Sequence, residues 1–196
     1  MVSARKAGYV VKLLAICERI TADGVEGVSA RVHPALVPLS HPLASVHGAN
    51  NAVFVEAEAA GSLMFYGAGA GGIQTASAVL GDVVSAARRH VAGGPGVAES
   101  THANLPVLPM SSVMTRYQIT LTVLDEPGVL ATIATLFSDR GVSVEGVAQS
   151  VGANSTATLV IITHEASESA LAATVEALAT TTVVSAVTSV LRVEGL

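Results

Sequence analysis

The stretch YQITLTVLDEPGVLATIATLFSDRGVSVEGVAQSV, residues 117–151, decides the predicted fold of the C-terminal half of the chain. Residues 117–124 alternate between apolar and polar, which is the period of a half-buried strand. The segment Asp125-Glu-Pro-Gly128 interrupts that strand, and apolar residues at 129, 130, 133, 136 and 137 then have the spacing of an amphipathic helix. A second strand is predicted over 142–151.

The residues that follow repeat this pattern. A turn at 152–154 leads into a third strand at 157–163, which is rich in β-branched residues. A helix over 166–179, with Ser167 as its cap, and a fourth strand over 183–193 complete the chain. The order βαββαβ is the ferredoxin-like split unit, so we expect a four-stranded antiparallel sheet with two helices on one face.

The N-terminal part is less regular. Strands are predicted at 8–17 and 28–37, a turn or short helix at 40–43, a hairpin from 52–58 and 62–66, and a helix at 75–90. We see no complete core there, so its strand edges would need partners. Glycines and prolines concentrate in the stretch that follows, which indicates a linker. We therefore predict an α+β protein with an N-terminal segment at 1–91, a linker at 92–114 and a C-terminal domain at 115–196.

Composition excludes several classes of protein. The 196 residues are 51% hydrophobic and 13% charged, far from a disordered chain, and this composition favours an oligomer that hides part of its surface. The net charge of -5 comes without a cluster of basic residues, so no nucleic acid is expected as a partner. The longest apolar run is broken by Lys12 and is too short to span a bilayer, so we expect no membrane partner and a cytoplasmic location.

The glycine-rich segment GAGAGG, residues 67–72, formally matches the dinucleotide fingerprint G-x-G-x-x-G. Its context does not, because the next acid is Asp82, inside the predicted helix, and no second strand follows before the linker. Two interpretations stay open. Glycines beside a helix N-terminus let backbone N–H groups approach an anionic ligand, or they only make a tight strand-to-helix crossover.

Four segments carry a resemblance to a known family. KLLAICER (12–19), HPLASV (41–46), GANNAV (48–53) and YGAGAGGIQTASAVLGD (66–82) resemble the closing part of the catalytic domain of homoserine dehydrogenase. They are most similar to the actinobacterial type, in which a C-terminal ACT domain follows. Residues 1–91 would then be the C-terminal part of the catalytic and dimerisation domain, and 115–196 the ACT regulatory domain.

The resemblance also implies an activity. The family interconverts L-homoserine and L-aspartate 4-semialdehyde with NADP or NAD, on the way to threonine, methionine and isoleucine. It implies that Gly71, with Gly69 beside it, contacts the nicotinamide cofactor. The family's Rossmann segment and catalytic lysine lie upstream of the matching part, so neither Lys6 nor Lys12 takes that role and no catalytic residue is assigned. We expect a truncated form that is inactive by itself.

The βαββαβ pattern resembles an ACT domain, which implies a homo-oligomer and a small amino-acid effector such as threonine. In this reading Asp125 meets the effector's ammonium group, while Gly128 and Val129 bring backbone N–H groups to its carboxylate. A plain turn with a helix cap explains the same residues equally well. The alternative function is a stand-alone ACT-type amino-acid-binding regulatory protein, and a remnant without function is a third reading.

The remaining candidate groups predict no chemistry. The spacing of His33, His41 and His47 matches no zinc pattern, so no metal is expected, and the two His-Pro pairs are interpreted as turns. Cys17 lies in an apolar run and is interpreted as a small buried residue. Glu56 and Glu58 alternate with apolar residues, which predicts the solvent face of a strand.

Overall fold

The structure is a computed structural model that describes residues 4–5, 7–93, 104–152 and 155–195. It divides into two compact units. One unit joins Met1–Leu39 to Leu105–Leu196, and the other is Ser40–Asn104. The first unit therefore combines two parts of the chain that lie far apart in the sequence.

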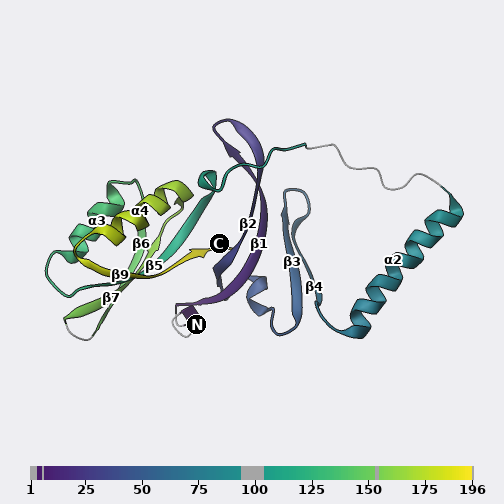
Figure 1. Cartoon of the computed structure of the whole chain (residues 1–196), viewed down its shortest axis with the longest axis horizontal. Coiled ribbons are helices and arrows are strands. Elements are labelled where there is room, and N and C mark those ends of the chain that lie inside the picture. The colour runs from purple at the N-terminus through teal and green to yellow at the C-terminus, as the bar shows by residue number, and fades with distance from the viewer. Residues whose placement is uncertain (1–3, 6, 94–103, 153–154, 196) are drawn as a thin grey trace. The chain divides into compact units, whose positions relative to one another are not determined.

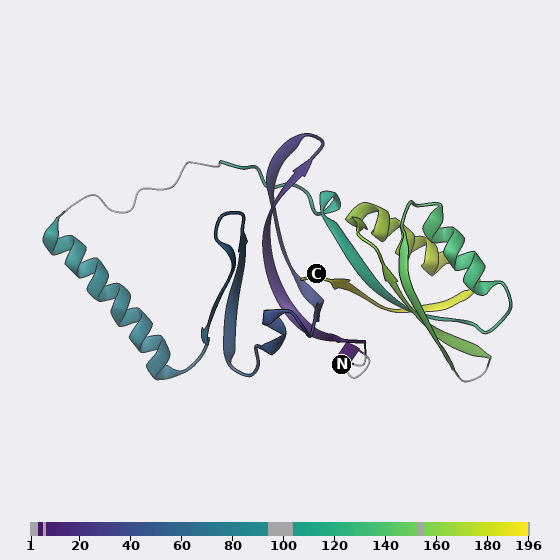
Figure 2. The same cartoon turned by 180° about the vertical axis from the view of Figure 1, so that it is seen from behind.

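The C-terminal part of the first unit has the predicted βαββαβ order. Its elements are β5 (Met114–Leu124), α3 (Val129–Ser138), β6 (Val144–Val151), β7 (Thr156–Thr163), α4 (Glu168–Thr180) and β9 (Val184–Val193), with a two-residue strand β8 (Ala166–Ser167) beside the start of β5. The strands pair antiparallel in the order β9-β5-β7-β6. Both helices lie on the same face of the sheet (Figures 1 and 2), which confirms the prediction.

The core of this part lies between the sheet and the two helices. Alternate residues of β5 are buried, as its period-2 pattern predicts, and β7 shows the same alternation of burial although its sequence does not alternate in polarity. The largest fully buried side chains come from both strands and both helices: Ile119, Leu121, Ile133, Phe137, Leu159, Ile161, Leu171 and Leu178. Burying each such side chain contributes about 1.5–3 kcal/mol. The predicted cap is also present, because the Ser167 hydroxyl accepts a hydrogen bond from the Ala170 N–H at 3.2 Å.

A long hairpin extends the same sheet. Strands β1 (Tyr9–Ala22) and β2 (Val25–Pro38) have 14 residues each and pair antiparallel along their whole length. Both are longer than predicted, because Asp23 and Gly24 have positive φ (51° and 76°) and form a tight two-residue turn. Strand β2 then pairs in parallel with β9, so the sheet order is β1-β2-β9-β5-β7-β6. The sequence analysis did not anticipate this pairing.

The predicted linker is partly structured. Residues 94–103 of it lie outside the described residues. Downstream of them, the Val28 N–H donates to the Pro106 carbonyl at 2.9 Å and the Leu108 N–H donates to the Val28 carbonyl at 2.8 Å. A short 3-10 helix, η2 (Met110–Ser112), then leads into β5. These contacts lie within the first compact unit, which includes residues from Leu105 onward. The domain boundaries 1–91, 92–114 and 115–196 stay a prediction.

The second unit holds η1 (Pro42–Ser45), the antiparallel hairpin of β3 (Asn50–Ala57) and β4 (Gly61–Ala68), and the 21-residue helix α2 (Gly72–Ala92). The predicted turn, hairpin and helix are thus all present. No side chain of α2 is buried, and the one buried residue in the described part of this unit is Ala44. Several large apolar side chains are exposed here: Val53, Val55, Leu63, Phe65, Tyr66, Ile73, Val79, Leu80, Val83, Val84 and Val91.

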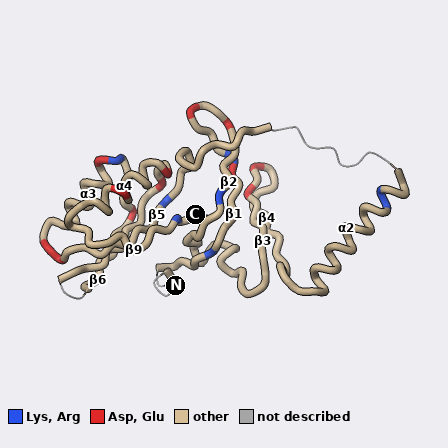
Figure 3. The backbone as a smooth tube through the Cα atoms, viewed as in Figure 1, with Lys and Arg blue, Asp and Glu red and all other residues tan. Residues whose placement is uncertain are grey.

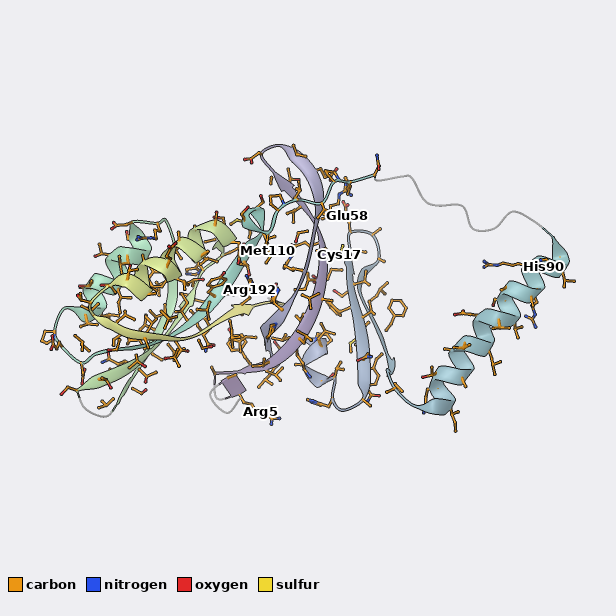
Figure 4. All side chains as sticks on the ribbon, viewed as in Figure 1. Arg5, Cys17, Glu58, His90, Met110 and Arg192 are labelled. Carbon is orange, nitrogen blue, oxygen red and sulfur yellow. The ribbon has the colours of Figure 1, made fainter. Side chains whose placement is uncertain are left out.

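Two predictions about single residues are wrong. His33 is not in a turn but in the middle of β2, where it is buried, because the strand continues through Pro34. Cys17, on β1 (Figure 4), is exposed, as are Leu13 and Ala15 at the alternate positions of the same strand. The prediction for His41 is confirmed, because its Nδ1 accepts from the Leu43 N–H at the start of η1. Glu56 and Glu58 are exposed as expected.

Charged side chains are sparse, and most of the backbone tube carries neither sign (Figure 3). Among the described helices, none has both the length and the apolar character needed to cross a membrane.

Candidate functional site

The glycine-rich segment connects β4 to α2 and lies against the loop that precedes β3. The Gly69 N–H donates to the Ala49 carbonyl at 2.9 Å. A Cβ placed on Gly69 would overlap the side-chain amide of Asn51. Two of the quoted motifs, GANNAV and GAGAGG, therefore meet in space, and glycine is required at position 69 if Asn51 is to stay in place.

The other predicted cofactor residue begins the helix. Gly71 is the N-cap of α2 with φ 132°, a conformation that side-chain-bearing residues rarely adopt. Its carbonyl accepts the Thr75 N–H at 3.0 Å, while the amides of the first turn have no acceptor within the helix. No side chain caps this end and the first turn holds no acidic residue. The combined helix dipole and free N–H groups favour an anionic ligand such as a phosphate or carboxylate.

The surroundings of this loop differ from those of a self-contained nucleotide-binding fold. Strands β3 and β4 form an antiparallel hairpin, whereas the fingerprint opens a parallel βαβ unit. Two neighbours of the loop were missed by sequence reasoning. Asn51 packs into the space above Gly69, and the Gln74 side chain occupies the space that a Cβ on Gly71 would take. The paired asparagines of GANNAV were the available signal for the first.

The predicted effector loop lies between β5 and α3. The Asp125 N–H donates to the Ser155 carbonyl at 3.0 Å, and its Oδ1 accepts from Gln149 Nε2 of β6 at 3.4 Å. Gly128 is left-handed at φ 90° and begins α3 without a side-chain cap. A Cβ on Gly128 would meet no atom within 4 Å, so the space in front of this helix end is open.

Val129 lies differently from its neighbours in the loop. Its side chain is part of the hydrophobic core, and its N–H is 3.4 Å from the Glu126 carbonyl. The next residue, Leu130, is exposed. The N–H groups of Leu130 and Ala131 are therefore better placed than that of Val129 to receive a carboxylate, a detail that the sequence pattern could not resolve.

A buried polar cluster lies at the opposite end of β5 from this loop. The Tyr117 hydroxyl donates to Glu168 Oε1 at 2.7 Å, and Arg192 donates to Glu168 through Nε at 3.2 Å and through Nη2. The guanidinium carbon of Arg192 lies 5.6 Å from the centroid of the Tyr117 ring. Burial and the adjacent Glu168 raise the pKa of Tyr117 above its usual value. Burial opposes the charge of Arg192, but the hydrogen bond and charge of Glu168 outweigh it and raise the pKa of Arg192.

A second cluster joins β2 to the end of β9. His33 Nε2 lies 3.1 Å from Glu194 Oε1, and Arg31 Nη2 lies 3.5 Å from Glu194 Oε2. Arg31 also donates to Glu18 Oε2 and to the Ser29 hydroxyl, each at 2.8 Å. Burial and the nearby cations Arg192 and Arg31 lower the pKa of His33 more than Glu194 raises it. The imidazole is therefore favoured in its neutral form.

Comparison with known proteins agrees with the predicted dehydrogenase and ACT parts of the chain. Residues 1–84 match the family model for homoserine dehydrogenase, and residues 117–181 match the model for the ACT domain. The chain is 56% identical to a homoserine dehydrogenase of Mycobacterium leprae over 201 aligned residues, which cover 100% of this chain and 46% of that protein. The chain is thus similar to homoserine dehydrogenases along its whole length.

Further relatives agree with the actinobacterial type. A homoserine dehydrogenase of Corynebacterium glutamicum is 54% identical, with 98% of this chain and 43% of the relative covered. The crystal structure of a homoserine dehydrogenase from Thiobacillus denitrificans superposes with a TM-score of 0.87 at 33% identity, covering 98% of this chain and 44% of the other. The chain thus corresponds to the end of the homoserine dehydrogenase catalytic domain followed by an ACT domain, and it spans less than half the length of these relatives.

Proposed function

We propose that the chain is the cofactor-proximal and regulatory part of an enzyme that interconverts L-homoserine and L-aspartate 4-semialdehyde with NADP or NAD in the cytoplasm. The observation that supports it best is the start of α2, where Gly71 exposes first-turn N–H groups that no side chain caps. Gly69 and Gly71 are the residues that would lie against the cofactor, because neither carries a Cβ and the open helix end suits an anionic group. When bound, the nicotinamide supplies hydride exchange with the substrate.

The protein's own residues in this proposal bind and orient. Gly69 holds the loop to Ala49 through its N–H, and Asn51 fills the space beside it. Proton transfer is not assigned to any residue of the chain. Lys12, which lies on β1, stands outside the glycine loop in sequence, and His41 already accepts a hydrogen bond from the backbone of η1. The 196 residues by themselves would therefore lack dehydrogenase activity.

The test is NADPH oxidation in the presence of aspartate semialdehyde, followed at 340 nm with purified protein. We expect no turnover above the rate without enzyme. A homoserine dehydrogenase from one of the relatives serves as the positive control for the substrate preparation. Turnover by this chain at an ordinary enzymatic rate, about 1–1,000 per second, would contradict the proposal.

The regulatory part of the proposal concerns the loop at Asp125, Gly128 and Val129. A small amino acid such as threonine would place its ammonium group at Asp125 and its carboxylate at the start of α3, at the Leu130 and Ala131 N–H groups next to Val129. Calorimetry against threonine, methionine, isoleucine and valine tests this step. Saturable heat with one of them supports the effector site, and no heat with any of them contradicts it.

Homo-oligomerisation completes the proposal. Strand β6 is an edge of the sheet and exposes Val147 and Val151, and the second unit exposes the apolar side chains of β3, β4 and α2. Apolar surface of this extent is typical of interaction sites. Light scattering coupled to gel filtration should give a mass of at least twice 19.7 kDa, and a monomer at micromolar concentration would count against it.

A stand-alone ACT-type amino-acid-binding protein is the second candidate. The ACT part has a complete hydrophobic core, whereas the described residues of the second unit bury only Ala44. Both candidates predict effector binding without turnover, so the discriminating measurement is whether NADPH slows hydrogen exchange of residues 67–75. Effector binding without such protection would favour this alternative.

A further inference from the structure

The contact between strands β2 and β9 joins the hairpin of the dehydrogenase segment to the sheet of the ACT domain. It is short. Only two residue pairs meet in parallel, Ala35 with Arg192 and Leu36 with Val193, and the Glu194 N–H adds a hydrogen bond to the Leu36 carbonyl at 3.0 Å. Figure 4 labels Arg192 at this end of β9. So few backbone bonds need support from side chains.

Side chains supply that support on both faces of the sheet. On one face, Leu36 and Val193 form a small buried cluster with Ala4. On the other face, Glu194 receives Arg31 and His33 from β2, and all three side chains are buried to at least 85%. Charge-assisted hydrogen bonds in such a site are strong and directional. We call the contact formed by Arg31, His33 and Glu194 the β2–β9 joint.

The joint is connected to the effector loop by two paired strands. Strand β5 ends at Leu124, one residue before Asp125. The Leu124 N–H donates to the Val183 carbonyl at 3.1 Å. From there β5 and β9 pair as far as Arg116 with Val193. Their register shifts between Thr120 and Leu121 and again between Thr122 and Val123. Irregularities of this kind are where a sheet can change its local twist.

Strand β2 has a second attachment to the C-terminal part. The Val28 N–H donates to the Pro106 carbonyl and the Val28 carbonyl accepts from the Leu108 N–H, and the absence of a side chain on Gly27 leaves room for Leu108. The hairpin is thus held at Val28 and again at Leu36, so a movement of β9 relative to this anchor would act on the residues between them.

We propose that the β2–β9 joint transmits amino-acid binding at residues 125–128 and the first turn of α3 to the β1–β2 hairpin, with Glu194 as the positioning residue that holds β2 to the ACT sheet. The inference rests on the proposed effector function. When an amino acid binds and orders the loop, β5 and β9 open less often, and the contact of Glu194 with Arg31 and His33 reduces the opening of β2 as well. Without the Glu194 carboxylate, the backbone contacts and the Leu36–Val193 cluster remain, and the transmitted effect weakens.

Hydrogen–deuterium exchange of the purified protein tests the inference. The backbone amides of residues 28–38, apart from Pro34 and Pro38, are followed with and without a saturating concentration of whichever of threonine, methionine, isoleucine or valine gives heat in calorimetry. We expect exchange in the wild-type protein to slow about fivefold, the lower end of ordinary coupling between sites. In Glu194→Gln the same amino acid should still bind, with its effect on residues 28–38 reduced to less than half.

Two further variants make the result interpretable. Glu176→Gln removes an exposed carboxylate from α4 and should keep the full effect on β2. His33→Gln keeps a hydrogen-bond donor toward Glu194 and serves if Glu194→Gln does not fold; it should retain a reduced effect. Heat of binding with unchanged exchange in wild-type β2, or an undiminished effect in both joint variants, would overturn the inference. No heat with any amino acid would instead reject the effector site, and the coupling with it.

Discussion

Replacing Glu168 with alanine should lower the free energy of unfolding more than any single substitution on the surface. The Glu168 side chain is 11% exposed and accepts hydrogen bonds from the Tyr117 hydroxyl and from two nitrogens of Arg192. Removing one partner of a buried ion pair costs about 3–5 kcal/mol. Because the Arg192 side chain is 25% exposed and can regain water, we expect the lower part of that range, about 3 kcal/mol in the free energy of unfolding.

Urea denaturation followed by circular dichroism measures this loss. Glu176→Ala is the matched control, since it removes an exposed glutamate from the same helix and should change the free energy of unfolding by less than about 0.5 kcal/mol. Tyr117→Phe removes only the hydroxyl and should cost about 1–2 kcal/mol. In the double variant the two losses should not add, because both remove the same hydrogen bond. A Glu168→Ala midpoint equal to that of the control would refute the view that this cluster is stabilising.

Three other perturbations test particular contacts. The pKa of His33 is lowered in the folded protein, so the unfolded chain binds the proton more readily and stability should fall as the pH decreases below about 6.5. In thermal melts from pH 5 to 8, the melting temperature should therefore fall less in His33→Gln than in the wild-type protein. Identical pH profiles of the two proteins would contradict the assignment. The Cβ added in Gly128→Ala meets no neighbouring atom, yet the φ of 90° at this position should lower the free energy of unfolding by about 1–2 kcal/mol. Urea denaturation would detect this loss. The control is Gly146→Ala on β6, because this glycine does not have a positive φ and its added Cβ also meets no atom within 4 Å. In Gly27→Ala the new Cβ would lie 2.6 Å from the Pro106 carbonyl oxygen, so the Val107 and Leu108 amides should exchange faster. Unchanged exchange at these two amides would show that this contact does not hold the segment.

The ACT part was predictable because its local patterns agree with its tertiary environment. Residues 117–124 alternate in burial as their sequence alternates in polarity, since one face of the sheet is covered by helices. Residues 157–163 were legible as a strand from their β-branched residues instead. The cap at Ser167 and the interruption at Gly128 were also legible, because both follow from backbone geometry within one turn. The hairpin of β3 and β4 was found for the same local reasons.

The errors concern residues whose environment is set from far along the chain. His33 was interpreted as a turn residue because Pro34 follows it, yet β2 continues and buries the imidazole against Glu194, 161 residues away. Cys17 was interpreted as buried because its neighbours are apolar, but it is exposed together with Leu13 and Ala15 at alternate positions of β1. Asn51 and Gln74 entered the glycine-loop site only when the backbone brought them beside Gly69 and Gly71.

The amino-acid sequence alone thus determined the types and order of the elements and the family resemblance. It also indicated the glycine loop and the Asp125–Gly128 loop as candidate binding sites. These features were predictable because periodicity, turn chemistry and motifs depend on residues that are close together in the chain. The tertiary structure decided that β2 extends the ACT sheet through β9, that Val129 faces the core, and that Arg31, His33 and Glu194 meet. The reason is that pairing between distant strands and the burial of charged side chains depend on which surfaces come together, and local residue patterns do not encode that choice.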